Sequence, residues 1–235
     1  MRTWKESFLA IDTESVGMPR PGVTPRLFAL ATALYERRVE VSTVLTLFSP
    51  PEGQQVNRSI LDANLDLVPA SARGQLDRLP TFRGRASLVQ DRLLSSRVWA
   101  GHHIPFDLAC LTQEFKFASR DLDRFMKAND ITVVDTRPLA AWLRRAELGT
   151  ERRRALAEVG LKACLERWAP ETLTPAPKRA EAVLQDVTAS ARLLLGMMKE
   201  LPDDLEELRA LQQQAAEFMQ KTFPTKASRV TSPLS

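Results

Sequence analysis

The sequence has few of the residues that hold small secreted proteins together, and it has no segment suited to a membrane. Only two of its 235 residues are cysteine, which is too few for a disulfide framework. Both Cys110 and Cys164 lie in apolar patterns of helical spacing, which favours buried thiols. No stretch reaches the roughly 18 consecutive apolar residues that a membrane span requires, and the first ten residues carry no long apolar run. We therefore expect no membrane segment and a cytoplasmic location by default.

Internal repeats and low-complexity segments are also lacking, and the remaining composition is that of a globular protein. The chain is 44% hydrophobic and 26% charged, and its length fits one large domain. Its small positive net charge is concentrated between residues 137 and 154, where six arginines face only two glutamates. Such a basic stripe suits a polyanionic partner, although a solvated arginine-rich helix face would give the same pattern.

The predicted strands arrive first as a hairpin and then alternate with helices. A short apolar run, Ser7–Ile11, reads as a buried strand that ends at Asp12. The other predicted strands are Leu27–Tyr35, Val39–Phe48, Val98–Ala100 and Ile131–Val134. This order is typical of an α/β fold in which helices flank a mixed sheet.

Helical periodicity is clearest over Arg83–Leu94 and Ala155–Trp168, and again from Val183 to Met198. A last helix is predicted to begin at Pro202-Asp203-Asp204, where acidic residues favour a helix start. Its apolar stripe could pack on its own domain or bind a protein partner. We therefore expect a main domain over residues 1–200, a C-terminal helix packed on it over 201–223, and a disordered tail over 224–235.

Carboxylates follow two of the predicted strands, and a third group lies on a later helix. Asp12 and Glu14 are two residues apart, so in an extended chain both would project to one face. Asp107 comes shortly after the strand that ends at Ala100, and Asp186 lies in the Ala- and Leu-rich helix AVLQDVTASARLLL. Oxygen ligands placed together suit Mg²⁺ or Mn²⁺. Each group alone is weak, because acids at strand ends and on helix surfaces are common.

Together, in this order, these groups resemble the DEDD family of 3′–5′ exonucleases, the DnaQ-like proteins of the ribonuclease-H-like fold. FLAIDTESVG is similar to the first motif of that family, and VWAGHHIPFDLACL to its second, GHN-x-x-FD, with His103 where Asn is common. VVDTRPLA and the Leu79-Pro80-Thr81-Phe82 turn are also similar to stretches of that family. The resemblance covers residues 7 to 200, approximately.

The resemblance implies that Asp12, Glu14, Asp107 and Asp186 bind two divalent cations, Mg²⁺ or Mn²⁺. Cations about 3.5–4 Å apart would clamp the scissile phosphate, one activating water and the other stabilising the leaving 3′ oxygen. The substrate implied is single-stranded DNA or RNA with a 3′ end, cut to nucleoside 5′-monophosphates. The resemblance implies Thr13, His103 and Phe106 as substrate contacts, and the basic stripe adds Arg152 and Arg153 as candidate contacts to backbone phosphates.

The sequence departs from the family at the general base. The histidine subfamily has a His five residues before the last Asp, where this chain has Glu181, and the tyrosine subfamily has a Tyr four residues before it, where this chain has Ala182. Glu181 could replace the base, but near two cations its pKa would be low, which makes it a weak one. An active exonuclease, a catalytically impaired nucleic-acid-binding or scaffold protein, and a hydrolase of small phosphodiesters all stay open at this point.

Overall fold

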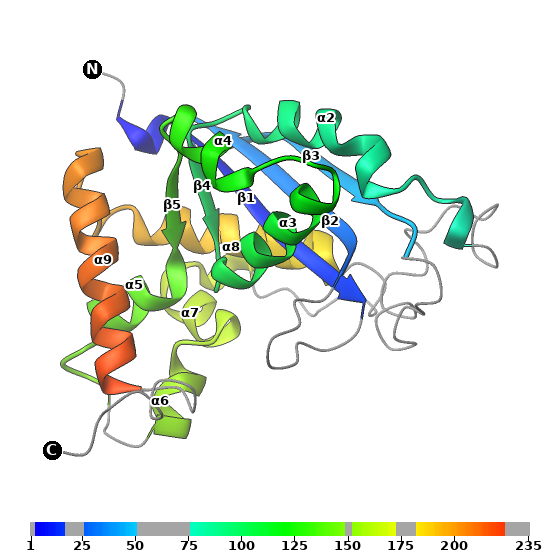
Figure 1. Ribbon diagram of the computed structural model, residues 1–235. Coiled ribbons are helices and arrows are strands. Elements are labelled where there is room, and N and C mark those ends of the chain that lie inside the picture. The colour runs from blue at the N-terminus through cyan, green and yellow to red at the C-terminus, as the bar shows by residue number, and fades with distance from the viewer. Residues whose placement is uncertain (1–2, 17–25, 51–75, 149–151, 173–181, 224–235) are drawn as a thin grey trace, which may run out of the picture.

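The computed structural model describes residues 3–16, 26–50, 76–148, 152–172 and 182–223, and its core is one five-stranded sheet (Figure 1). The strands are β1 (Ser7–Val16), β2 (Arg26–Glu36), β3 (Val39–Leu47), β4 (Val98–Gly101) and β5 (Thr132–Asp135), in the order β3-β2-β1-β4-β5. The first three strands pair antiparallel, whereas β4 and β5 are parallel to β1. The predicted α/β fold with a mixed sheet is confirmed.

The predicted hairpin is β2 and β3, and its bounds agree with the prediction to within one residue. Arg37 and Arg38 connect the two strands, and both have positive φ angles, 49° and 68°. Two-residue hairpin turns whose twist matches the strands need this left-handed backbone. The charged Glu36-Arg37-Arg38 between two β-rich stretches was therefore a correct signal of the turn, although Glu36 is itself the last residue of β2.

Helices cover both faces of the sheet (Figure 1). They are α2 (Phe82–Leu93), α3 (Pro105–Phe117), α4 (Leu122–Ala128), α5 (Thr136–Leu143), α6 (Arg152–Glu158), α7 (Leu161–Trp168), α8 (Ala182–Met197) and α9 (Leu205–Thr222). Because side chains alternate along a strand, β1 contributes Leu9 and Ile11 to a core with α2 and α3. Phe8 and Ala10 point the other way, into a core with α8.

One helix prediction was wrong in its extent. Ala155–Trp168 was predicted as a single helix, but the structure has two helices there: α6 ends at Glu158 and α7 begins at Leu161. Gly160 precedes α7 in an extended conformation, with φ −70° and ψ 155°. The apolar spacing continues on both sides of this break, so periodicity alone could not reveal it.

The C-terminal helix α9 lies along α5 at the β5 edge of the sheet (Figure 1). Leu208 and Ala215 are buried, and the Phe218 ring lies 5.8 Å from that of Trp142. None of the helices in the described ranges is long and apolar enough to cross a membrane. The predicted tail, 224–235, lies outside the described residues.

Candidate functional site

Asp12 and Glu14 lie within strand β1 rather than after it. The strand was expected to end before Asp12, but it continues to Val16 because β2 stays paired with it along its whole length. The residues opposite Asp12 and Glu14 on β2 are Ala31 and Ala29. These small neighbours leave room above the sheet for the two carboxylates, which project to one face as the spacing predicts.

Asp107 lies in the first turn of α3, as predicted, and its residue is only 5% exposed. The Thr13 hydroxyl donates a hydrogen bond to Asp107 Oδ1 at 2.6 Å, which ties α3 to β1. Gly101 permits this approach, since a Cβ there would lie 2.9 Å from Cβ of Ile104 and 3.0 Å from the carbonyl oxygen of Ile11. The glycine of the GHH segment is therefore required by close packing.

Asp186 comes from α8, which packs across β1 and β2. Val183 and Val187 on the same helix are fully buried, whereas the side chain of Asp186 is exposed. Burial of part of its surface still raises the pKa of Asp186 above its ordinary value. This combination indicates a carboxyl group that faces protein on one side and water on the other.

Asp12 and Glu14 on β1 are affected by the charges of acids on other elements. Burial raises the pKa of Asp12 well above its ordinary value, and the charges of Asp107, Asp186 and Glu14 raise it further. Burial and then the charge of Asp186 raise the pKa of Glu14 to about 7. Burial also raises the pKa of Asp107 to about 7, against the opposing effect of hydrogen bonds from Thr13. Asp186 therefore lies near enough to Asp12 and Glu14 for its charge to act on both.

The donor set consists of carboxylate oxygens alone, which are the ligands that Mg²⁺ and Mn²⁺ prefer. Within the described ranges, no three Asp, Glu, His or Cys side chains already form a complete metal-ligand group. The acids nonetheless fit divalent cations chemically, because their mutual repulsion is what a bound cation relieves. Their role as metal ligands stays a prediction.

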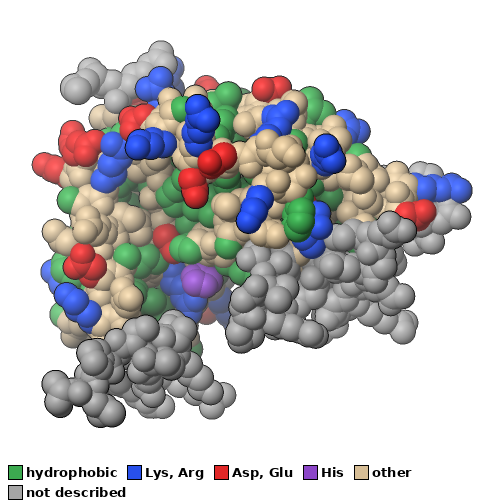
Figure 2. Space-filling model, in the orientation of Figure 1, with side chains coloured by type: hydrophobic (Ala, Val, Ile, Leu, Met, Phe, Trp, Pro, Cys, Tyr) green, Lys and Arg blue, Asp and Glu red, His purple; other side chains and the backbone are tan. Residues whose placement is uncertain are grey.

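A fifth acid, Asp135, lies at the end of β5, where its charge acts on Asp107, and the sequence did not suggest a role for it. Burial raises its pKa to about 6, although hydrogen bonds from the backbone of Arg137 and His103 oppose the shift. The positive charge of Arg137 in turn adds to burial in lowering the pKa values of His102 and His103. Figure 2 shows histidine and basic side chains side by side in the lower middle of the view. The VVDTRPLA stretch was the sequence signal for this acid.

The predicted substrate contacts have different positions. Thr13 is buried and bonded to Asp107, His103 is exposed, and Phe106 is partly buried against the core on the α3 side. The backbone of Arg152 and Arg153 lies in α6, but their side chains are outside the described residues, as is the whole of Glu181.

The basic stripe does not form a uniform free row. Arg144 bonds to the backbone and carboxylate of Glu158 and also pairs with Glu147. The guanidinium of Arg145 stacks 4.4 Å from the ring centre of Trp142. Two of the six arginines therefore contact neighbouring protein side chains, which a count of charges in the sequence could not show.

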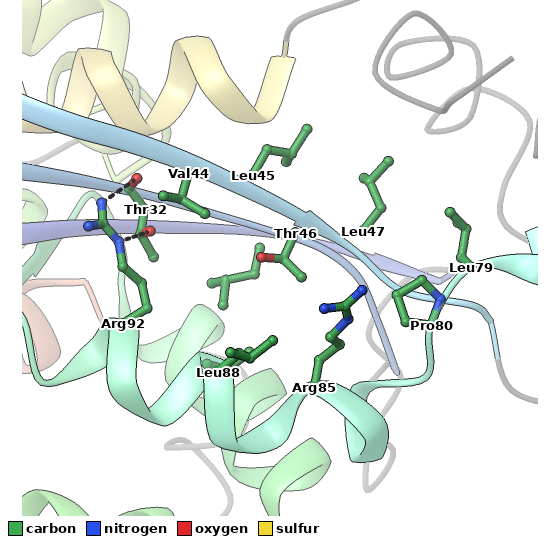
Figure 3. A pocket seen from close by; sticks show the side chains of 12 residues that line it. Thr32, Val44, Leu45, Thr46, Leu47, Leu79, Pro80, Arg85, Leu88 and Arg92 are labelled. Carbon is green, nitrogen blue, oxygen red and sulfur yellow. Dashed lines mark hydrogen bonds between the residues drawn. The ribbon is translucent and has the colours of Figure 1, made fainter.

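A separate hollow of about 480 Å³ lies between α2 and strands β2 and β3 (Figure 3). Arg92 crosses it to donate hydrogen bonds to Thr32 and Ser42, while Arg85 and the exposed Leu88 line its α2 side. None of the four acids lines this hollow. It is therefore distinct from the candidate site.

Comparisons with known proteins give structural neighbours only. No family model matches the chain, and no curated protein matches it. Among solved structures, the nuclease domain of 3'hExo, described as a DEDDh family member bound to rAMP, aligns with a TM-score of 0.57 and 13% identity, over 83% of this chain and 92% of that one.

Two exonuclease I structures align somewhat better but only in part. A product-bound structure of exonuclease I gives a TM-score of 0.60 at 15% identity over 83% of this chain. The zinc-ion-bound E. coli ExoI–ssDNA complex gives 0.60 at 13% identity over 92% of this chain. This chain spans 43% of the length of each of them. The common part is the mixed sheet with its flanking helices, and the chain has the ribonuclease-H-like fold of these exonuclease domains.

Proposed function

We propose that this protein is a metal-dependent 3′–5′ exonuclease that hydrolyses phosphodiester bonds of DNA or RNA. The observation that supports the proposal is electrostatic: the charges of Asp107, Asp186 and Glu14 raise the pKa of Asp12, and the charge of Asp186 raises that of Glu14. The fold shared with exonuclease domains supports it.

The four carboxylates would hold divalent cations, Mg²⁺ or Mn²⁺, at the end of β1. Cations bound there supply electrostatic stabilisation of the charge that develops on a phosphoryl group during its transfer. The chain contributes position: Asp12 and Glu14 are fixed by the β1–β2 pairing, and Asp107 by its bond from Thr13. Arg137 supplies positive charge beside the exposed His103, where the phosphate backbone of a nucleic acid would bind.

We assign the role of proton acceptor to Glu181, which stands where the histidine subfamily has its base. The two histidines of the chain are poor substitutes. His102 bonds through Nδ1 with the Thr136 hydroxyl, and burial together with the charge of Arg137 lowers its pKa to about 4. Its Nε2 is also buried, so it cannot reach a water molecule in the site.

The test is degradation of single-stranded DNA and RNA, each labelled at the 5′ end, with Mg²⁺, Mn²⁺ or EDTA. We expect a ladder of products shortened from the 3′ end that needs a divalent cation, and no products from strands with a blocked 3′ end. Asp12→Ala should lower kcat at least about 100-fold, and Glu181→Ala by a similar factor of about 100. The exposed Glu166, on α7, supplies a control substitution, Glu166→Ala. Activity that survives Asp12→Ala would contradict the proposed site.

A second candidate is a catalytically impaired exonuclease-fold protein that binds nucleic acid or serves as a scaffold. The absence of a His or Tyr at the base position favours it. Binding of the same strands without cleavage under every metal condition would select this candidate.

A further inference from the structure

The turn that delivers Asp107 has no capping side chain of its own. Ile104 stands at the N-cap of α3 and makes no side-chain cap bond, and Pro105 follows as the first helical residue. One residue earlier, His103 has a φ of 72°, the left-handed region that non-glycine residues seldom adopt. Something outside the turn must therefore hold it in this conformation.

The carboxylate of Asp135 makes that connection. Its Oδ1 accepts a hydrogen bond from the backbone N–H of His103 at 2.8 Å and another from that of Arg137 at 3.1 Å. Asp135 is 6% exposed and is also the N-cap of α5. One oxygen therefore joins the β4–α3 turn to the β5–α5 turn.

The position of His103 is passed on to Asp107 through the helix backbone. The N–H of Phe106 donates to the carbonyl of His103 at 3.2 Å, and that of Leu108 donates to Ile104 at 2.9 Å. These bonds build the turn of α3 in which Asp107 lies. A shift of His103 would consequently move Asp107 relative to β1.

The C-terminal helix holds Asp135 from the other side. Gln212 of α9 accepts a hydrogen bond from the Asp135 N–H at 3.0 Å. One turn earlier on α9, Arg209 donates to the Thr132 hydroxyl at 2.9 Å and pairs with Asp130 at 2.7 Å. α9 is thus hydrogen-bonded to both ends of β5, to Thr132 at its beginning and to Asp135 at its end.

We propose that Asp135 is a positioning residue that sets the orientation of Asp107 through the backbone of His103, and that α9 supports it through Gln212. This inference rests on the proposed nuclease function for its catalytic consequence. The geometry gives α9 a role in the site, in addition to covering the edge of the sheet.

Two pairs of substitutions separate this role from simple loss of stability. Each pair has one member that removes the hydrogen-bond acceptor and one that keeps it. Asp135→Ala removes the acceptor, whereas Asp135→Asn keeps an Oδ1 that can accept both N–H bonds. Gln212→Ala and Gln212→Glu form the matching pair on α9. Asp121→Ala removes a helix cap away from the site, because Asp121 caps α4 by accepting a bond from the Arg124 N–H at 2.9 Å.

Amide hydrogen exchange of residues 101–107, the Mn²⁺-induced rise in Tm, and kcat and KM are measured for each variant. We expect Asp135→Ala to exchange faster in this segment, to lose most of the Mn²⁺ effect, and to lower kcat about 100-fold with little change in KM, as for a misplaced catalytic group. Asp135→Asn should restore all three readouts, and Gln212→Ala should show a weaker form of the defect that Gln212→Glu restores. Asp121→Ala should lower Tm without these changes.

Retention of slow exchange and of the Mn²⁺ effect in Asp135→Ala would overturn the proposal, as would equal defects in Asp121→Ala. If the unsubstituted protein cleaves no strand, the proposed function fails, but exchange and Mn²⁺ stabilisation still decide whether Asp135 positions Asp107.

Discussion

Replacing Glu14 by glutamine removes one negative charge from the acid site and keeps the length of the side chain. Glu14 is partly buried beside Asp186, and burial followed by that charge raises its pKa from 4.5 to about 7. An acid with a raised pKa binds its proton more tightly in the folded state than in the unfolded one. The folded protein consequently loses stability as the pH rises from about 4.5 through 7, and the full loss is present above pH 7.

The size of this effect follows from the shift. One pKa unit corresponds to about 1.4 kcal/mol, so ionised Glu14 costs up to about 3 kcal/mol of folding free energy at pH 8. Glutamine carries no such penalty. For a chain of this length, about 3 kcal/mol corresponds to an increase in Tm of roughly 6–12 °C. Glu14→Gln should therefore stabilise the protein in EDTA at pH 8, although the residue belongs to the proposed site.

Differential scanning calorimetry at pH 8 and at pH 5 measures the two predicted differences. In EDTA, the variant should melt above the unsubstituted protein at pH 8, and the gap should shrink at pH 5, where Glu14 is protonated in the folded state. Added Mn²⁺ should stabilise the unsubstituted protein more than the variant and so reduce the gap at pH 8. Glu166→Gln, on the exposed face of α7, serves as the matched control and should change Tm little. A lower Tm for Glu14→Gln in EDTA at pH 8 would refute the idea that burial and the charge of Asp186 penalise the ionised side chain.

Two further substitutions test the backbone. His103→Asn should raise stability by about 0.5–1 kcal/mol, because asparagine tolerates the φ of 72° better than histidine; urea unfolding measures it, and no gain would argue against strain at this turn. Gly196→Ala should destabilise by about 3 kcal/mol or more, since a Cβ there would overlap the backbone carbonyl of Trp168 where α7 crosses α8; a Tm within about 2 °C of the unsubstituted protein would show that the two helices can separate at low cost.

Strands and helix faces could be predicted because local patterns encode them. The hairpin has a polar two-residue turn between β-rich runs, and Thr81 caps α2 by accepting a bond from the Gly84 N–H at 3.1 Å. The end of β1 could not be predicted in the same way. Asp12 and Glu14 resemble residues beyond a strand, and only the pairing with Ala31 and Ala29 on β2 keeps them extended.

The acidic residues of the candidate site could be predicted from the sequence, but the hydrogen bonds that position them could not. The order of the acids carried the resemblance, whereas the bond from Thr13 to Asp107 spans 94 residues and that from Asp135 to Gln212 spans 77. Such contacts depend on how elements pack, which no local pattern contains. The same limit applies to Arg144, which pairs with Glu158 at a separation of 14 residues along the chain.

The electrostatics of the site also bears on the choice between an enzyme and a scaffold. Burial and repulsion of these carboxylates cost stability, and the ionised Glu14 alone accounts for up to about 3 kcal/mol of a total that is typically 5–15 kcal/mol. Without cations, these acids would also repel the phosphates of a nucleic acid brought to the end of β1. If the protein is the proposed nuclease, we expect binding of a 3′ end at this site to require divalent cations, whereas a scaffold that binds through basic surfaces alone would bind equally well in EDTA. Affinity for a single strand with and without EDTA, compared in the unsubstituted protein and in Asp12→Asn, distinguishes the two: an enzyme site binds poorly in EDTA and regains affinity when the acidic charge is removed.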